Sequence, residues 1–103
     1  MQLISASEFK SYLVDSNFQI IDVREPYEIN LSSMKSLNIP MAEVINRISE
    51  IDKEKVICVV CKTGKRASAV ANLLETEFNF KDILVLEGGL TEYSLIEPSF
   101  LID

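Results

Sequence analysis

A six-residue loop contains the residues best suited to chemistry. It reads Cys61-Lys62-Thr63-Gly64-Lys65-Arg66 and directly follows the most hydrophobic segment of the chain. We expect a helix to begin near Arg66, and the first turn of a helix presents unpaired backbone N–H groups and a partial positive charge. A short loop wrapped over that turn can aim further N–H groups at one point and so bind an anion. A thiol at this point is pushed toward thiolate, which is its nucleophilic form.

The other side chains of the loop suit the same role. Lys62, Lys65 and Arg66 add positive charge. A glycine allows the backbone conformation that a tight loop requires. The sequence therefore predicts Cys61 as a catalytic nucleophile. The residues expected to favour an anion around it are Gly64 and the cations Lys62, Lys65 and Arg66.

The composition excludes most other catalytic sites. The 103 residues include no histidine and only two cysteines, and the formal net charge is −6. Without an imidazole there is no Ser-His-Asp triad and no Cys-His pair, and two cysteines cannot complete a four-ligand zinc site. We therefore expect no metal and no cofactor. The acidic balance argues against nucleic-acid binding, although five of the ten basic residues lie within positions 53–66.

The hydrophobic pattern and the cysteine count favour a single cytoplasmic domain over residues 1–103, with both cysteines reduced. The longest apolar run, Val56–Cys61, has six residues, whereas a membrane helix needs roughly 18 or more. The N-terminus has no basic segment followed by a long apolar one, so no signal peptide is expected. Two cysteines do not form a disulfide framework. We expect no membrane partner.

Strand and helix patterns alternate along the chain. Residues 55–60 are β-branched and apolar without alternation, which is typical of a strand buried on both faces of a parallel sheet. The other expected strands are 2–4, 18–23, 36–39 and 83–86, and the expected helices are 5–13, 25–31, 43–51, 67–78 and 90–96. The helix at 43–51 would place four residues on one core-facing stripe: Val44, Ile45, Ile48 and Ile51. The predicted fold class is α/β, a three-layer α/β/α arrangement around a mainly parallel sheet of about five strands. Ligands bind such sheets at the carboxyl ends of the strands, where the loop lies.

Four segments together resemble a known family. Cys61-x-x-Gly64-x-Arg66 resembles the active-site loop of the rhodanese family, sulfurtransferases that carry sulfur as a cysteine persulfide. Three further segments resemble family motifs, in the family's order: Asp22-Val23-Arg24-Glu25-Pro26, Asn38-Ile39-Pro40 and Leu86-Glu87-Gly88-Gly89. The resemblance spans nearly the whole chain and implies a single-domain, rhodanese-like fold.

The resemblance also implies a reaction. Cys61 would take sulfur from thiosulfate or a persulfide donor and pass it to a thiol acceptor, or to cyanide in vitro, in a ping-pong sequence. The expected partners are a small anionic sulfur donor and a sulfur-donor or sulfur-acceptor protein. The resemblance implies that the donor is bound by the loop residues Lys62, Thr63, Gly64, Lys65 and Arg66, with the Thr63 hydroxyl as a further hydrogen-bond donor. The charges of Asp22 and Arg24 are expected to form a buried salt bridge. Tyr93 is expected to pack where the family has a tryptophan, and residues 30–37 lack the family's histidine and glycines.

Two further interpretations concern function, and one concerns the second thiol. A noncatalytic rhodanese-like interaction or regulatory module would share the fold. A cysteine-dependent phosphatase would use a related loop, but with five residues between cysteine and arginine instead of the four found here. Cys58 and Cys61 have the spacing of a redox pair, yet residues three apart on a strand point to opposite faces. We therefore expect Cys58 to be a core residue.

Overall fold

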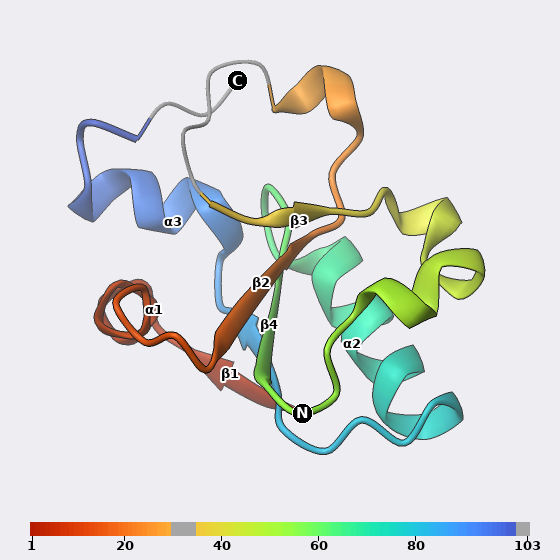
Figure 1. Cartoon of the computed structure of the whole chain (residues 1–103). Coiled ribbons are helices and arrows are strands. Elements are labelled where there is room, and N and C mark those ends of the chain that lie inside the picture. Colours follow the sequence, from red (N-terminus) through yellow and green to blue (C-terminus); the bar gives the residue numbers. More distant parts are fainter. Residues whose placement is uncertain (30–34, 101–103) are drawn as a thin grey trace.

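A five-stranded parallel sheet forms the centre of the molecule. A computed structural model of the chain describes residues 1–29 and 35–100. Within them the strands are β1 (Gln2–Ile4), β2 (Phe18–Asp22), β3 (Leu37–Asn38), β4 (Val56–Val60) and β5 (Ile83–Leu86). Their order across the sheet is β1-β5-β4-β2-β3, and every neighbouring pair is parallel. The predicted fold class is confirmed, with the hydrophobic strand β4 in the middle (Figure 1).

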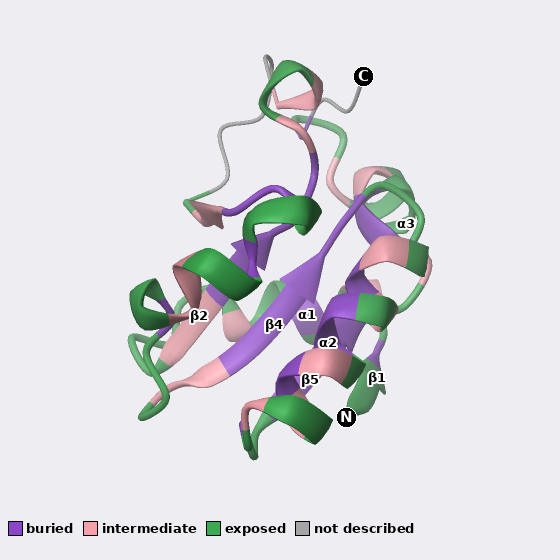
Figure 2. Ribbon diagram, turned by 90° about the vertical axis from the view of Figure 1, so that its right-hand side faces the viewer, coloured by how far each residue is buried: buried purple, intermediate pink, exposed green. Residues whose placement is uncertain are grey.

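Helices cover both faces of the sheet. On one face α1 (Ala6–Tyr12) packs beside α3 (Gly89–Ile96), and on the other lies α2 (Lys65–Glu77) (Figure 1). The apolar side chains accordingly form two core clusters, one on each side of the sheet. Figure 2 shows that β4 is buried along nearly all of its length, as expected for a strand covered on both faces.

On the face of the sheet that carries α1 and α3, the observed structure matches the predictions made from the sequence. The Ser5 hydroxyl accepts a hydrogen bond from the Glu8 N–H, and the Glu8 carboxylate accepts one from the Ser5 N–H, so the predicted capping box starts α1. Phe9 from α1 then meets Tyr93 from α3 in an edge-to-face contact with ring centroids 5.2 Å apart. Tyr93 is buried and also packs against Phe100, which confirms its predicted packing role.

The single helix predicted at residues 43–51 is wrong. The chain forms two 3₁₀ segments, η2 (Met41–Glu43) and η3 (Ile45–Glu50), with non-helical dihedral angles at Arg47 inside the second. A 3₁₀ helix has three residues per turn, so a stripe spaced for 3.6 residues does not stay on one face. Val44 and Ile51 are buried as predicted, whereas Ile45 is 59% exposed and does not join the core.

The helix predicted at residues 25–31 is only one 3₁₀ turn, η1 (Pro26–Glu28), within the residues that the structure describes. Pro26 occupies its first position, where its missing N–H costs no hydrogen bond. The turn ends at Ile29, while residues 30 and 31 of this prediction and most of the departure from the family at residues 30–37 lie outside the described residues. This short turn brings Glu28 close to the loop at 61–66.

Candidate active site

Cys61 lies at the carboxyl end of the central strand. It follows β4 directly and contributes to the core cluster that includes α2, whereas Cys58 contributes to the opposite cluster with α1 and α3. Both thiols are free and buried. The structure therefore confirms that the two cysteines point to opposite faces of the sheet, and that Cys58 is a core residue.

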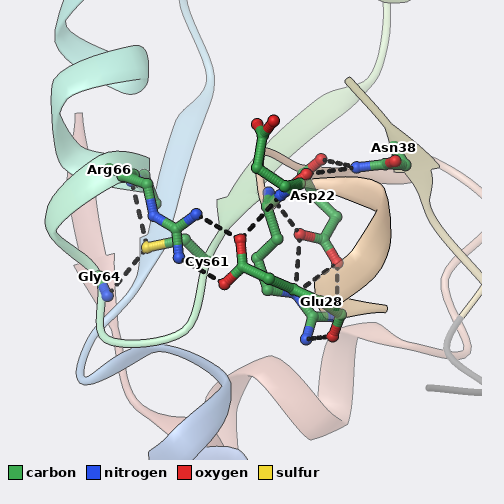
Figure 3. Close-up of polar contacts among 9 residues, drawn as sticks. Asp22, Glu28, Asn38, Cys61, Gly64 and Arg66 are labelled. Carbon is green, nitrogen blue, oxygen red and sulfur yellow. Dashed lines mark hydrogen bonds and ion pairs between the residues drawn. The ribbon is translucent and has the colours of Figure 1, made fainter. Parts of the chain in front are cut away.

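The Cys61 sulfur is held by backbone N–H groups at the start of α2. The Gly64 N–H donates to Sγ over 3.1 Å and the Ala67 N–H over 3.4 Å (Figure 3). Gly64 is the N-cap of the helix and has a φ of +101°, so the tight turn predicted at this glycine is present. N–H donors at a helix N-terminus stabilise negative charge on sulfur. Cys61 is only 1% exposed, so a molecule that reacts with its sulfur must be small or must approach it end-on at the base of the loop.

The first residues of α3 hold this loop in place through hydrogen bonds to its backbone carbonyl groups. The Leu90 N–H donates to the Cys61 carbonyl over 2.9 Å. The N–H and hydroxyl of Thr91 both donate to the Lys62 carbonyl, over 3.1 and 2.9 Å. These bonds hold two consecutive carbonyl groups toward α3 and so set the orientation of the first peptide planes of the loop. This role of Thr91 was not predicted from the sequence, although the Gly88-Gly89 pair marked the start of α3.

The three cations of the loop differ in their surroundings. Lys62 and Lys65 are exposed, as is Thr63, and within the described part of the chain neither lysine forms an ion pair. The Arg66 guanidinium is instead paired with the Glu28 carboxylate through two hydrogen bonds, of 2.7 and 3.0 Å. Arg66 was predicted to be one of the anion-binding cations, but no local pattern indicated this partner, which lies 38 positions away.

Glu28 is itself held in place on η1. Its Oε1 also accepts a hydrogen bond from the Glu25 N–H over 2.8 Å, and its carbonyl accepts one from the Arg24 side chain over 3.1 Å. The hydrogen bonds from Arg66 lower the pKa of the Glu28 carboxyl to about 2. The same contact raises the pKa of Arg66, to which the nearby Cys61 and Tyr27 also contribute. The pair therefore stays ionised at neutral pH.

A buried ion pair supports this part of the site. The Arg24 side chain donates three hydrogen bonds to the Asp22 carboxylate, the shortest over 2.8 Å, and both residues are at most 2% exposed. Asn38 from β3 donates to the carbonyls of both Asp22 and Arg24, each over 2.9 Å (Figure 3). The predicted buried salt bridge is confirmed. It anchors the turn that presents Glu28 to Arg66.

The two thiols should differ sharply in reactivity. Burial raises the pKa of the Cys58 thiol to about 12, so it stays neutral at any pH at which the protein is handled. We expect iodoacetamide at neutral pH to add one group per native chain, on Cys61, and two groups in urea. Peptide mass analysis locates the label. Modification of Cys58 before Cys61 in the native protein would contradict this assignment.

The family is established by comparison with known proteins. The sequence model described as "Rhodanese-like domain" matches residues 5–95. The chain belongs to the rhodanese-like domain family. The rhodanese-related protein of Thermoplasma volcanium has the same fold, with a TM-score of 0.82 and 26% sequence identity, and the match covers 100% of this chain and 98% of that one.

Two relatives illustrate the range of this family. The chain is 35% identical to "Rhodanese-like/PpiC domain-containing protein 12, chloroplastic" of Arabidopsis thaliana; the match covers 93% of this chain but only 35% of that protein's length. It is 30% identical to "Putative sulfurtransferase YtwF" of Bacillus subtilis, with 84% of each chain covered. A rhodanese-like domain thus occurs both in a protein of similar length and within a much longer one.

Cellular location remains a prediction. The name of the Arabidopsis relative places that protein in the chloroplast. In residues 1–29 and 35–100 of this chain, no helix combines the length and the hydrophobicity needed to cross a membrane. The cytoplasmic location predicted from the sequence rests on that sequence alone.

Proposed function

We propose that this rhodanese-like domain is a sulfurtransferase that carries sulfane sulfur as a persulfide of Cys61. The observation that carries the proposal is the pair of N–H groups, from Gly64 and Ala67, that converge on the Cys61 sulfur at the start of α2. Such donors stabilise the thiolate that attacks and the persulfide anion that forms. The name of the Bacillus subtilis relative is consistent with this chemistry.

The first half-reaction loads the enzyme. The Cys61 thiolate attacks the outer sulfur of thiosulfate, and a new S–S bond forms as the bond to the sulfonate sulfur breaks. The electron pair of the broken bond leaves with sulfite, and Cys61 retains the outer sulfur as a persulfide anion. A persulfide donor reacts in the same way and releases its thiolate. No proton need be transferred, which agrees with a sequence that has no histidine.

The second half-reaction unloads it. An acceptor thiolate attacks the outer sulfur of the persulfide, takes that sulfur, and releases the Cys61 thiolate. Cyanide accepts the same sulfur and forms thiocyanate. Because the enzyme is covalently modified between the two steps, the kinetics are ping-pong. Lys62 and Lys65, exposed on the loop, attract the anionic donor.

Two other functions would use the same fold differently. A noncatalytic interaction module has no need for N–H groups aimed at a thiol, and here two of them contact Sγ directly. A phosphatase must bind a phosphoryl group between the sulfur and the loop, and this loop has one residue fewer than such enzymes use. Neither function therefore explains the loop as well as sulfur transfer does.

Intact-mass analysis tests the proposal. After incubation with thiosulfate or an alkyl persulfide, the wild-type chain should gain one sulfur atom, which cyanide or dithiothreitol removes. Cys61→Ser should gain none, because it lacks the nucleophile, whereas Cys58→Ala should gain sulfur as the wild type does. No gain by the wild type from either donor would overturn the proposal and favour the noncatalytic module. Loading on Cys58 would overturn the assignment of the nucleophile.

A further inference from the structure

The charge pattern around Cys61 is not simply positive. Arg66 is tied to Glu28 by two hydrogen bonds, so this pair adds no net charge to the site. Lys62 and Lys65 are exposed, and exposed charges are screened by water and salt. Glu28 is half-buried and its position is fixed, because its carboxylate also accepts a hydrogen bond from the Glu25 N–H and its backbone carbonyl accepts one from the Arg24 side chain. An anionic donor must therefore approach a site in which the Glu28 carboxylate already neutralises the Arg66 guanidinium.

We propose that Glu28 selects the sulfur donor by charge, disfavouring dianions such as thiosulfate relative to donors with a single negative charge at the reacting sulfur. This inference rests on the proposed sulfurtransferase function. The Coulomb energy between Glu28 and a donor is proportional to the donor's charge, so thiosulfate is repelled about twice as strongly as an alkyl persulfide anion at the same place. Glu28 is a positioning and selectivity residue because it acts through charge and through Arg66, without touching the reacting sulfur.

The substitution Glu28→Gln separates charge from shape. The amide keeps an oxygen that can accept one hydrogen bond from Arg66, but the negative charge is gone and the guanidinium is left unneutralised. At low ionic strength we expect the second-order rate constant for loading Cys61 to rise roughly tenfold with thiosulfate and about threefold with 2-hydroxyethyl persulfide. The logarithm of the rate gain with thiosulfate, divided by that with the persulfide, should be about two, the ratio of the donor charges. Both gains should shrink as salt is added.

Arg66→Gln provides the opposite change. It leaves the Glu28 carboxylate unneutralised beside the site, so loading by thiosulfate should fall more steeply than loading by the persulfide. The double variant Glu28→Gln/Arg66→Gln should recover much of the loss with thiosulfate. Glu28→Asp keeps the charge and should keep the wild-type ratio of the two rate constants, even if the shorter side chain slows both reactions.

A matched control removes the same charge at the other end of the sheet. Glu54 is exposed and precedes β4, whereas Cys61 follows it. At low salt Glu54→Gln should therefore change both loading rates much less than Glu28→Gln does. At about 0.15 M salt it should leave them unchanged within about 1.5-fold, because the Debye length of about 8 Å is then shorter than the strand β4. A rise in thiosulfate loading equal to that of Glu28→Gln would show that only the net charge of the protein matters, and would overturn the inference.

The decisive measurement is single-turnover loading of the full chain, followed by quenched intact-mass analysis with each donor at low and high salt. A larger gain for thiosulfate than for the persulfide in Glu28→Gln supports the selectivity role. Equal gains, equal losses or gains that do not respond to salt overturn it, since a merely structural effect would not depend on donor charge. If the wild type takes sulfur but the ratio does not change, only this inference fails; if it takes sulfur from neither donor, the proposed function fails as well.

Discussion

Replacement of Arg24 by methionine should lower the free energy of unfolding by about 3–5 kcal/mol. The Asp22 carboxylate is 2% exposed and receives three side-chain hydrogen bonds from Arg24, so the variant leaves a buried carboxylate without its partner. Domains of this size are stable by about 5–15 kcal/mol in total, so the loss is a large part of the whole. Urea denaturation followed by circular dichroism measures it as a lower midpoint.

The same substitution at a surface arginine is the control for this prediction. Arg47 forms ion pairs with Glu43 and Glu50 that are comparable in length to the Arg24 pair but lie at the surface. Arg47→Met should lower the urea midpoint far less than Arg24→Met, because water solvates the carboxylates that remain. Adding Asp22→Asn to Arg24→Met should restore part of the lost stability, since the buried charge is then absent. Equal costs for Arg24→Met and Arg47→Met would contradict the role assigned to burial.

Substitution of Gly89 by alanine should lower the stability by about 2–4 kcal/mol and displace the active-site loop. A Cβ at this position would lie 2.4 Å from the Lys62 carbonyl oxygen and 2.7 Å from that of Cys61. These atoms belong to the backbone that α3 holds in place, so they cannot move aside without breaking the Leu90 bond to Cys61. We therefore expect slower persulfide formation as well as a lower urea midpoint.

The neighbouring glycine distinguishes this clash from backbone strain. Gly88 has a φ of +77° and Gly89 a φ of +67°, so alanine is disfavoured by conformation at both positions. At Gly88, however, the new Cβ would meet only the side chain of Glu92, which can rotate away. Gly88→Ala should cost about 1 kcal/mol and leave loading of Cys61 nearly unchanged. If the two variants lost the same activity, close approach of α3 to the loop would not be what Gly89 provides.

The elements that the sequence predicted well are those with strong local patterns. The unbroken apolar run of β4 identified the central strand, and the capping box at Ser5 and Glu8 identified the start of α1. The segment at 43–51 was misjudged because apolar residues at helical spacing do not distinguish an α-helix from consecutive 3₁₀ turns. Ile45 shows the difference, since it is exposed although it belongs to the apolar pattern.

Local features of the chain were enough to identify the candidate nucleophile. Cys61 ends a strand and precedes a helix N-terminus, and both features are local, as is the strand geometry that sends Cys58 to the other face. The sequence also identified the loop cations. Those inferences required no knowledge of which distant residues meet.

The surroundings of that loop depend instead on contacts between residues far apart in the chain. Glu28 lies 38 positions from Arg66 and Thr91 lies 29 positions from Lys62, and neither contact has a periodic or local signal. They form because parallel pairing places the carboxyl ends of β2, β4 and β5 at one edge of the sheet, where the segments that follow the three strands converge. Whether Arg66 faces the site as a free cation or as half of an ion pair therefore depends on the strand order, which no single segment of the sequence contains.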